Sequence, residues 1–201
     1  MRRRSLPIAT PPDPRERLGS LVRSTPWLLE VLQAARDVDP PDWLVGGGVL
    51  RDLVWDHLHG RSGPPQPRDV DLAFFDATRL DPARDAEVEQ ALQARLPGVP
   101  WDAKNQAAVH TWYDRVYGGE VAPLTSSADG VATWPETATA VAVRLLPDDR
   151  VQVVAPCGLD DLFGLVCRRN PRRVSVAHYR RRVRDKRIAD RWPGVRIVEG
   201  G

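Results

Sequence analysis

The sequence predicts an α/β (α+β) domain in which helices flank a small mixed sheet and a helical piece follows towards the C-terminus. Three observations support this fold class. Residues 42–75 contain an apolar segment, a glycine turn, a helical segment and a second apolar segment. Residues 138–155 contain two apolar segments separated by a polar turn, which is typical of a β-hairpin. Residues 175–191 place apolar side chains at helical spacing among many arginines.

The first of these units begins with a strand, Asp42 to Val45, that leads into Gly46-Gly47-Gly48. Residues 49–58 (VLRDLVWDHL) then repeat apolar side chains at helical spacing. The glycine- and proline-rich loop at 60–68 ends this helix and reverses the chain. Free N–H groups and the helix dipole attract phosphate at a helix start. The turn is therefore a candidate phosphate site, although a triple glycine also occurs as a simple tight turn.

Two aspartates, Asp69 and Asp71, begin the next predicted strand, which continues to Phe75. Side chains at positions i and i+2 of a strand point to the same face. Two carboxylates about 4 Å apart repel by roughly 4 kcal/mol at an effective dielectric near 20. A divalent cation between them removes this repulsion, and oxygen ligands suit Mg²⁺, which often completes its coordination with phosphates. The alternative without a function is a solvated strand end, but the neighbouring glycine turn favours a site for a metal and a nucleoside triphosphate.

Further elements follow from the same patterns. The sequence predicts a helix over 82–96, a strand over 99–103, the hairpin strands 138–146 and 151–155, and helices over 158–168 and 175–191. Asn105 is a good N-cap for a helix after the 99–103 strand.

The chain resembles the nucleotidyltransferases that share the DNA polymerase β-like fold, whose signature is a glycine pair at a helix start followed by an Asp-x-Asp strand. More closely, it is similar to a bacterial nucleotidyltransferase-like family. The resemblance covers roughly residues 26–193 and is carried by the segments GGGVLRDLVWDHLHG, RDVDLAFFD, PWDAKNQAAVH, SSADGVATWPETATAVAVRL and APCGLDDLFGLVCRRNP. Cys157 departs from the family, which tends to have an aromatic residue there.

The resemblance implies roles for individual residues. Gly47 and Gly48 match the pair that lets the backbone approach the triphosphate, and Asp69 and Asp71 match the pair that binds Mg²⁺ or Mn²⁺. Arg51, one turn into the helix, is placed to contact phosphate oxygens. Its alternative is an ion pair with Asp52 or another acid.

A third carboxylate that accepts a proton from the attacking hydroxyl is also implied by the superfamily. Asp102 on the 99–103 strand is the best candidate, with Asp76 and Glu136 as rivals. Lys104 and Asn105 are candidates for contacts with the nucleotide or the acceptor. For these two, a solvated lysine and a helix cap are the equally weighted alternatives.

Charge is distributed unevenly along the chain. Residues 168–196 hold twelve Lys and Arg against two acids, a local charge of +10, which leaves −8 for the remainder. This basic segment predicts either a solvated helix face or a surface for nucleic acid. Two cysteines and the lack of a signal-peptide or membrane-span pattern favour a reduced, cytoplasmic compartment. We expect a leader at 1–23 that is partly disordered, followed by one domain at 24–201.

These features predict a metal-dependent enzyme that transfers a nucleoside monophosphate from a nucleoside triphosphate, ATP among them, to an acceptor and releases pyrophosphate. The acceptor is open between a small molecule, RNA and a protein. Two alternatives stay open. One is an inactive nucleotide-binding regulator, and the other is an RNA-binding protein that uses the basic C-terminal helix.

Overall fold

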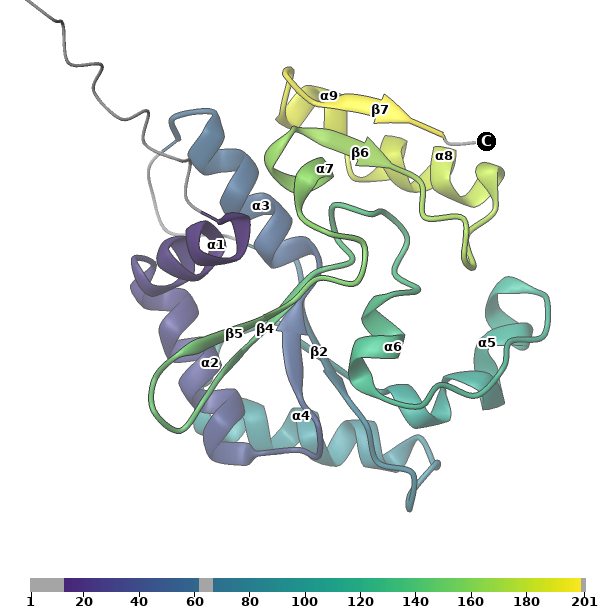
Figure 1. Ribbon diagram of the computed structural model, residues 1–201. Helices are drawn as coiled ribbons and strands as arrows, with labels where there is room; N and C mark the ends of the chain where they lie inside the picture. Colours follow the sequence, from purple (N-terminus) through teal and green to yellow (C-terminus); the bar gives the residue numbers. More distant parts are fainter. Residues whose placement is uncertain (1–12, 62–66, 200–201) are drawn as a thin grey trace, which may run out of the picture.

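The computed structural model describes residues 13–61 and 67–199. At its centre is a five-stranded mixed sheet with the strand order β3-β2-β1-β4-β5 (Figure 1). The strands are β1 (Leu44–Gly46), β2 (Val70–Phe74), β3 (Trp101–Asn105), β4 (Ala142–Leu145) and β5 (Val151–Val154). β2 and β3 run parallel, and the other neighbouring pairs are antiparallel. This arrangement confirms the predicted mixed sheet.

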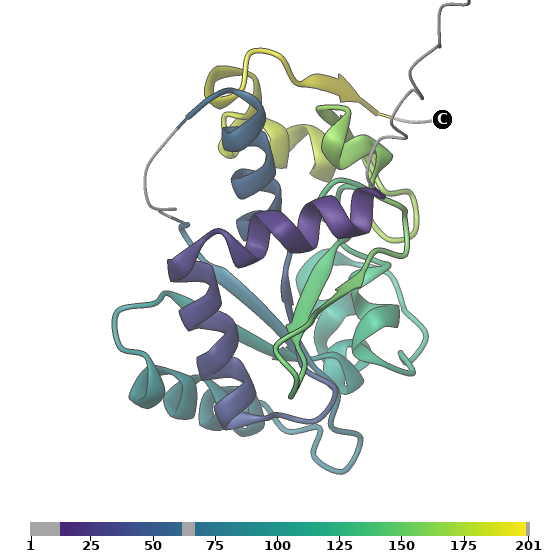
Figure 2. The ribbon, with the colours of Figure 1, turned by 60° about the vertical axis from the view of Figure 1, so that its left-hand side comes forward.

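Helices cover both sides of this sheet. α1 (Pro14–Arg23), α2 (Pro26–Val38) and α4 (Ala83–Arg95) pack on one side, whereas α5 (Val109–Tyr117) and α6 (Ser127–Val131) lie on the other (Figures 1 and 2). α3 (Gly48–Leu58) follows the C-terminal end of β1, the central strand of the sheet. The short 3₁₀ helix η1 (Gln106–Ala108) joins β3 to α5. Most of the core is one cluster of buried apolar side chains that includes residues of α1, the sheet and the C-terminal helices, and a second, small cluster consists of Leu44, Val131 and Ala142.

α1 corrects the predicted leader. Residues 1–12 lie outside the described part of the chain, but Pro14 begins a helix whose Leu18 and Val22 are fully buried in the core. Asp13 caps this helix by accepting a hydrogen bond from the Arg15 backbone N–H. Proline is well tolerated in the first turn of a helix, because the N–H that it lacks would have no partner there. Pro14, within the predicted leader, therefore starts a packed helix.

The C-terminal part, which we call the C-terminal segment (residues 160–198), contains α7 (Asp160–Phe163), β6 (Val166–Arg168), α8 (Val176–Asp185), α9 (Ile188–Arg191) and β7 (Arg196–Val198). β6 and β7 form a separate parallel pair. The predicted helix at 158–168 is wrong in its second half, because Leu165 has φ 52° and the chain then enters β6. The predicted helix at 175–191 is interrupted at Arg187, which has φ 51° and separates α8 from α9.

Aromatic side chains attach the C-terminal segment to α3. Trp55 of α3 and Trp192 after α9 are fully buried and meet edge to face with ring centroids 5.1 Å apart. The Trp192 indole N–H donates to Asp56 at 2.7 Å, and the Trp55 indole N–H donates to the Leu162 carbonyl at 2.9 Å. Large buried aromatics whose N–H groups have partners contribute strongly to packing. The segment is thereby fixed beside the helix that follows the glycine turn.

Candidate active site

The glycine turn joins β1 to α3 and passes close to the aspartates. A Cβ on Gly47 would lie 2.7 Å from Asp71 Oδ2, and a Cβ on Gly48 would lie 3.8 Å from Asp69 Oδ1. Gly47 also has φ 70°, a conformation that side chains rarely adopt. Gly46 is equally constrained, since its Cβ would lie 2.3 Å from the Val141 carbonyl oxygen. The turn thus requires glycine both for its backbone conformation and for the approach of the carboxylates.

The aspartates lie where β2 begins. Asp71 is paired in the sheet with Gly46 of β1 on one side and Asp102 of β3 on the other. Asp69 precedes β2 and faces the same glycine turn. The structure therefore brings the predicted turn and both aspartates together and places Asp102 in register beside them.

Negative charge is concentrated around Asp71. Burial, as the largest cause, and the nearby carboxylates of Asp69 and Asp102 raise the pKa of this carboxyl to about 6, although Lys186 and Arg182 act in the opposite direction. A carboxylate shifted this far lacks adequate compensation from its surroundings. Within the described residues, no three His, Cys, Asp or Glu side chains form a ready cage for a metal ion. A pair of carboxylates is nevertheless sufficient for Mg²⁺ when a phosphate supplies further ligands.

Asp102 and its two rivals differ in their surroundings. Asp102 is partly exposed and forms an ion pair with Lys104, with Nζ 2.8 Å from Oδ1. Asp76 accepts hydrogen bonds from Thr78 and Arg84 instead. Among the three candidates for the third acid, only Asp102 is in sheet register with Asp71.

Glu136, the second rival, is buried and bonded within the protein. Its carboxylate accepts from Arg182 Nε at 2.8 Å and from the Thr139 hydroxyl at 2.7 Å. Burial alone would raise its pKa, but the ion pair with Arg182 lowers the pKa below the ordinary value for glutamate. Glu136 therefore orients Arg182 rather than offering a free carboxylate to the site.

Arg51 forms the predicted alternative contact and still faces the site. Its guanidinium donates to Asp52 Oδ1 through Nε at 2.9 Å and through one terminal nitrogen at 2.5 Å. The side chain is 2% exposed, and its guanidinium lies beside the rings of both Trp55 and Trp192. The other terminal nitrogen is buried and has no hydrogen-bond partner in the described part of the molecule. Arg51 thus combines a pairing with Asp52 and one unused donor.

Asn105 has the capping role, which is one of the two alternatives that the sequence left open. Its side-chain oxygen accepts from the Ala107 and Asp76 backbone N–H groups, at 3.1 and 2.9 Å. Its amide donates to the carbonyls of Asp76 and Arg79. The side chain is buried and its hydrogen-bonding groups are used within the protein, so none is directed to a ligand. The N-cap pattern in the sequence was the correct interpretation.

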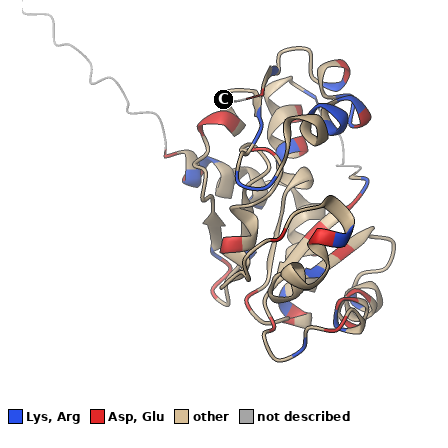
Figure 3. Cartoon of the chain, turned by 90° about the vertical axis from the view of Figure 1, so that its right-hand side faces the viewer, with Lys and Arg blue, Asp and Glu red and all other residues tan. Residues whose placement is uncertain are grey.

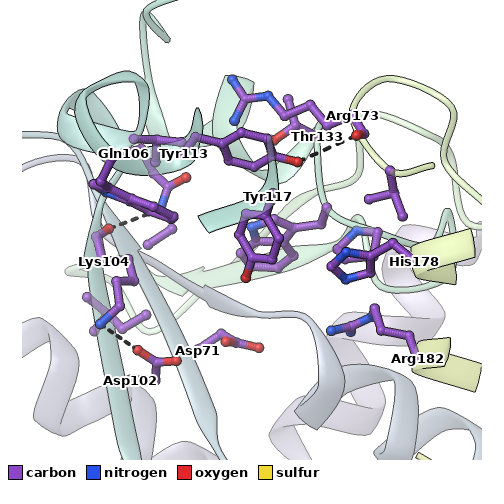
Figure 4. Close-up of a pocket in the computed structure, with 17 residues that line it drawn as sticks. Asp71, Asp102, Lys104, Gln106, Tyr113, Tyr117, Thr133, Arg173, His178 and Arg182 are labelled. Atoms are coloured by element: carbon purple, nitrogen blue, oxygen red, sulfur yellow. Dashed lines mark hydrogen bonds and ion pairs between the residues drawn. The ribbon is translucent and has the colours of Figure 1, made fainter. Parts of the chain in front are cut away.

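A pocket opens beside the carboxylates and encloses about 780 Å³ of empty space, its open mouth included. Asp71, Asp102 and Lys104 form one part of its lining (Figure 4). The opposite part comes from α5, from the loop after α6, and from α8 with the loop before it. It consists of Trp112, Tyr113, Tyr117, Thr133, Trp134, Arg173, His178 and Arg182. The pocket therefore joins an acidic floor to an aromatic and basic wall.

The aromatic wall was not predicted from the sequence. Tyr113 and Tyr117 lie 4.9 Å apart between ring centroids, and Tyr117 lies 5.3 Å from His178 of α8. The Arg173 guanidinium lies 5.3 Å from the Tyr113 ring, where cation–π attraction operates. Tyr113 and Tyr117 are four positions apart and share one helix face, which is a signal that the sequence does contain.

The basic C-terminal segment has many of its charges paired. Figure 3 shows Lys and Arg gathered on the C-terminal helices. Arg180 pairs with Glu199, Arg187 with Asp190, and Arg182 with Glu136. Arg181 and Arg184 are exposed. The sequence predicted either a solvated helix face or a surface for nucleic acid here. In both cases fewer unpaired cations are present than the sequence indicates.

A comparison with known families identifies this arrangement. A family model described as nucleotidyltransferase matches residues 33–197. The chain belongs to this nucleotidyltransferase family. Its reaction class is accordingly nucleotidyl transfer, and the resemblance found in the sequence is confirmed.

Solved structures place this nucleotidyltransferase among proteins of the same fold. One of them is an NMR structure described as revealing a CCA-adding enzyme head domain. Its sequence is 25% identical, its TM-score is 0.77, and the match covers 92% of this chain and 96% of that chain. A CCA-adding enzyme in complex with CTP has a TM-score of 0.52 at 19% identity, with coverage of 94% and 44%. The Thermotoga maritima CCA-adding enzyme complexed with tRNA has a TM-score of 0.52 at 18% identity, with coverage of 90% and 42%.

The head domain confirms the predicted polymerase β-like fold, and the two complexes support the fold alone. The nucleotidyltransferase spans less than half of the chains in these complexes. No curated protein matches it. None of the helices in the described part of the chain combines the length and apolar character that a membrane crossing requires.

Proposed function

We propose that the protein transfers a nucleoside monophosphate from a nucleoside triphosphate to an acceptor, releases pyrophosphate, and requires Mg²⁺ or Mn²⁺. The main support is the approach of the glycine turn to the Asp69 and Asp71 carboxylates. A phosphate donor at the helix start and a cation at the carboxylates would then lie next to each other.

Asp69 and Asp71 would hold the metal ion. The uncompensated charge of Asp71, whose pKa is raised by burial and by its acidic neighbours, fits a ligand of positive charge. When bound, the ion would stabilise the negative charge that develops on the reacting phosphate. Gly47 and Gly48 would let the backbone approach the donor, because no side chain separates the helix start from the carboxylates.

Asp102 would accept the proton of the attacking hydroxyl. One of its oxygens pairs with Lys104, which leaves the other oxygen as an acceptor. In the proposed step, the acceptor oxygen forms a bond to the α-phosphorus while the bond to the β-phosphate oxygen breaks and pyrophosphate leaves with the electron pair. The hydroxyl proton moves to Asp102.

In-line displacement requires the acceptor and the leaving pyrophosphate on opposite sides of the α-phosphorus. The glycine turn is on the β1 side of Asp71, and Asp102 is on the β3 side. The large pocket includes Asp102 and α5, so it would receive the acceptor. Its aromatic wall suits a flat ring within a small molecule, an RNA end or a protein side chain.

The test is release of pyrophosphate and transfer of label from each of four α-labelled nucleoside triphosphates, with Mg²⁺ and a cell extract as the source of acceptors. CTP and ATP are the first donors to try, because similar structures contain them. We expect Asp71→Asn to reduce both signals by at least about 100-fold, the usual order for loss of a transition-state electrostatic contact. The control is Asp148→Asn, since Asp148 is exposed in the turn between β4 and β5.

Equal turnover by the wild type and Asp71→Asn would overturn the proposal. Metal-dependent binding of nucleotide without pyrophosphate release would instead support the inactive regulator. Salt-sensitive RNA binding that survives replacement of Asp69 and Asp71 would support the RNA-binding alternative.

A further inference from the structure

Arg173 is a partly buried cation without a counter-charge at the large pocket. It lies in the loop between β6 and α8 and lines the pocket. Its guanidinium lies 5.3 Å from the centre of the Tyr113 ring, and in the described part of the chain it forms no ion pair and donates no hydrogen bond. Burial lowers the pKa of this guanidinium below its ordinary value, although Tyr113 and Asp129 act in the opposite direction. Cations removed from water are normally paired, so Arg173 has an unused capacity to bind an anion.

The other two permanent cations of the pocket lining have partners. Lys104 Nζ lies 2.8 Å from Asp102 Oδ1. Arg182 Nε lies 2.8 Å from Glu136 Oε1. Among the described residues that line the pocket, Arg173 is therefore the cation that lacks a carboxylate. A ligand with one anionic group would supply it.

The wall beside Arg173 is aromatic and uncharged. Tyr117 is 49% exposed, and its ring centroid lies 4.9 Å from that of Tyr113 and 5.3 Å from that of His178. Burial and two neighbouring arginines of α8 lower the pKa of His178, so its ring carries no charge at neutral pH. An exposed aromatic surface inside a pocket is stabilised by contact with another flat ring.

These groups follow one another along the pocket. In Figure 4, Asp71 and Asp102 lie at one end, Arg173 lies at the other, and the rings of Tyr113 and Tyr117 lie between them. A ligand that spans the pocket therefore meets carboxylates, an aromatic surface and a cation in that order. The complementary molecule carries a hydroxyl group, a flat ring and an anionic group in the same order.

The surroundings of Arg173 favour a small molecule over a nucleic acid. Binding of a nucleic acid depends on several cations that contact successive phosphates. On α8, Arg180 is paired with Glu199. Arg181 and Arg184 are exposed, and neither lines the pocket. One unmatched cation inside the pocket suits a ligand with one anionic group.

We propose that the acceptor is a small aromatic anion, whose ring lies against Tyr113 and Tyr117 and whose carboxylate or phosphate group binds Arg173. This inference rests on the proposed function and names the substrate class of its acceptor pocket. The acceptor hydroxyl lies towards Asp102. Its oxygen forms the bond to the α-phosphorus, its proton moves to Asp102, and pyrophosphate leaves with the electron pair of the broken bond. Arg173 selects the acceptor and takes no part in this exchange of bonds.

The test compares ligands that differ in one feature. The carboxylate pair is 4-hydroxyphenylacetate and its amide, the phosphate pair is phenyl phosphate and phenol, and 4-hydroxycyclohexylacetate lacks only the aromatic ring. Each is titrated into the isotope-labelled full chain without nucleotide or metal, and NMR chemical shifts report its affinity and its location. The variant is Arg173→Gln, which removes the charge. The matched control is Arg172→Gln, because Arg172 is exposed and does not line the pocket.

In the wild type, we expect the anion of at least one pair to bind at least about tenfold more tightly than its neutral partner, because charge-assisted contacts to a guanidinium are the stronger ones. The pair with the larger ratio identifies the anionic group. This ratio should fall below about twofold in Arg173→Gln and persist in Arg172→Gln. 4-Hydroxycyclohexylacetate should bind at least about threefold more weakly than the aromatic acid. Arg173→Lys keeps the charge, so it should retain a ratio of at least about threefold and tests the proposal if the glutamine variant unfolds.

Equal affinities within both pairs, or a ratio that survives Arg173→Gln, would overturn the inference. So would a short single-stranded RNA that binds more tightly than either anion and depends on Arg181 and Arg184. If the selectivity depends on Arg173 but no nucleoside triphosphate yields pyrophosphate, the anion site stands and the proposed reaction fails. If transfer depends on Asp71 but neither pair is discriminated, the reaction stands and the acceptor class is refuted.

Discussion

We expect neutralisation of Asp71 to stabilise the metal-free protein, although the proposed function predicts that it also abolishes transfer. Burial and the charges of Asp69 and Asp102 raise the pKa of Asp71 from 3.8 to about 6. Each pKa unit corresponds to about 1.4 kcal/mol, so the ionised carboxylate destabilises the folded state by about 3 kcal/mol. This penalty is complete only above the folded pKa, where Asp71 is ionised in both states. The stabilities of the wild type and Asp71→Asn should therefore be compared at about pH 8.

Urea unfolding with EDTA present measures this effect. An asparagine at position 71 still has polar atoms to bury, so we expect Asp71→Asn to gain about 1–3 kcal/mol, which corresponds to an increase in Tm of roughly 3–10 °C. Asp148→Asn should change stability by less than about 0.5 kcal/mol, because Asp148 and its partner Arg150 are both exposed.

Addition of Mg²⁺ tests the same reasoning from the other direction. A ligand that binds only the folded protein stabilises it, and we expect this gain in the wild type but not in Asp71→Asn. The reasoning is refuted if Asp71→Asn is no more stable than the wild type in EDTA at pH 8.

Two further predictions concern the C-terminal segment. Trp192→Ala should cost about 3–5 kcal/mol, because it removes a fully buried ring and a hydrogen bond to Asp56, and a decrease in Tm of less than about 2 °C in a thermal scan would contradict this. Glu136→Gln should cost about 3–5 kcal/mol at pH 7, because it leaves Arg182 without its buried partner. Since the folded pKa of Glu136 is lowered, its contribution is present above about pH 4.3 and is lost as the pH falls through the folded pKa. The gap between wild type and Glu136→Gln in the free energy of unfolding should therefore narrow as the pH falls below the ordinary pKa of glutamate, and a constant gap in urea unfolding would refute the assignment.

The unit around the glycine turn was predictable because it is local in the sequence. A strand, a glycine turn, a helix and a second strand follow one another within residues 42–75, and each has its own pattern of spacing. The observed β1, α3 and β2 match these positions within two residues. Pairing of β1 with β2 then brings Gly46 beside Asp71 without any distant partner. Local order was sufficient to predict where these residues meet.

Features that depend on distant pairing were not predictable in the same way. β6 is held by β7, nearly thirty residues later, and its sequence was interpreted as the end of a helix. The helical period of 175–191 continues through Arg187, where the backbone leaves the helix. Tertiary contacts decide such short elements more than intrinsic preference does. The position of Lys186 at the end of α8 follows from that interruption, so it could be located only from the structure.

Two sets of unbalanced charge explain why the fold retains costly groups near the glycine turn. Asp69, Asp71 and Asp102 concentrate negative charge on the β2 and β3 side. Arg51 and Lys186 keep cationic groups without sufficient partners on the α3 side. If these groups had only a structural role, the carboxylates and the cations would form ion pairs with each other, as Arg182 does with Glu136. A metal–triphosphate complex carries both signs in this spatial order, and its binding would compensate both sets at once. Lys186→Met should therefore weaken the triphosphate but leave binding of Mg²⁺ alone unchanged, a result that a purely structural role for Lys186 does not predict.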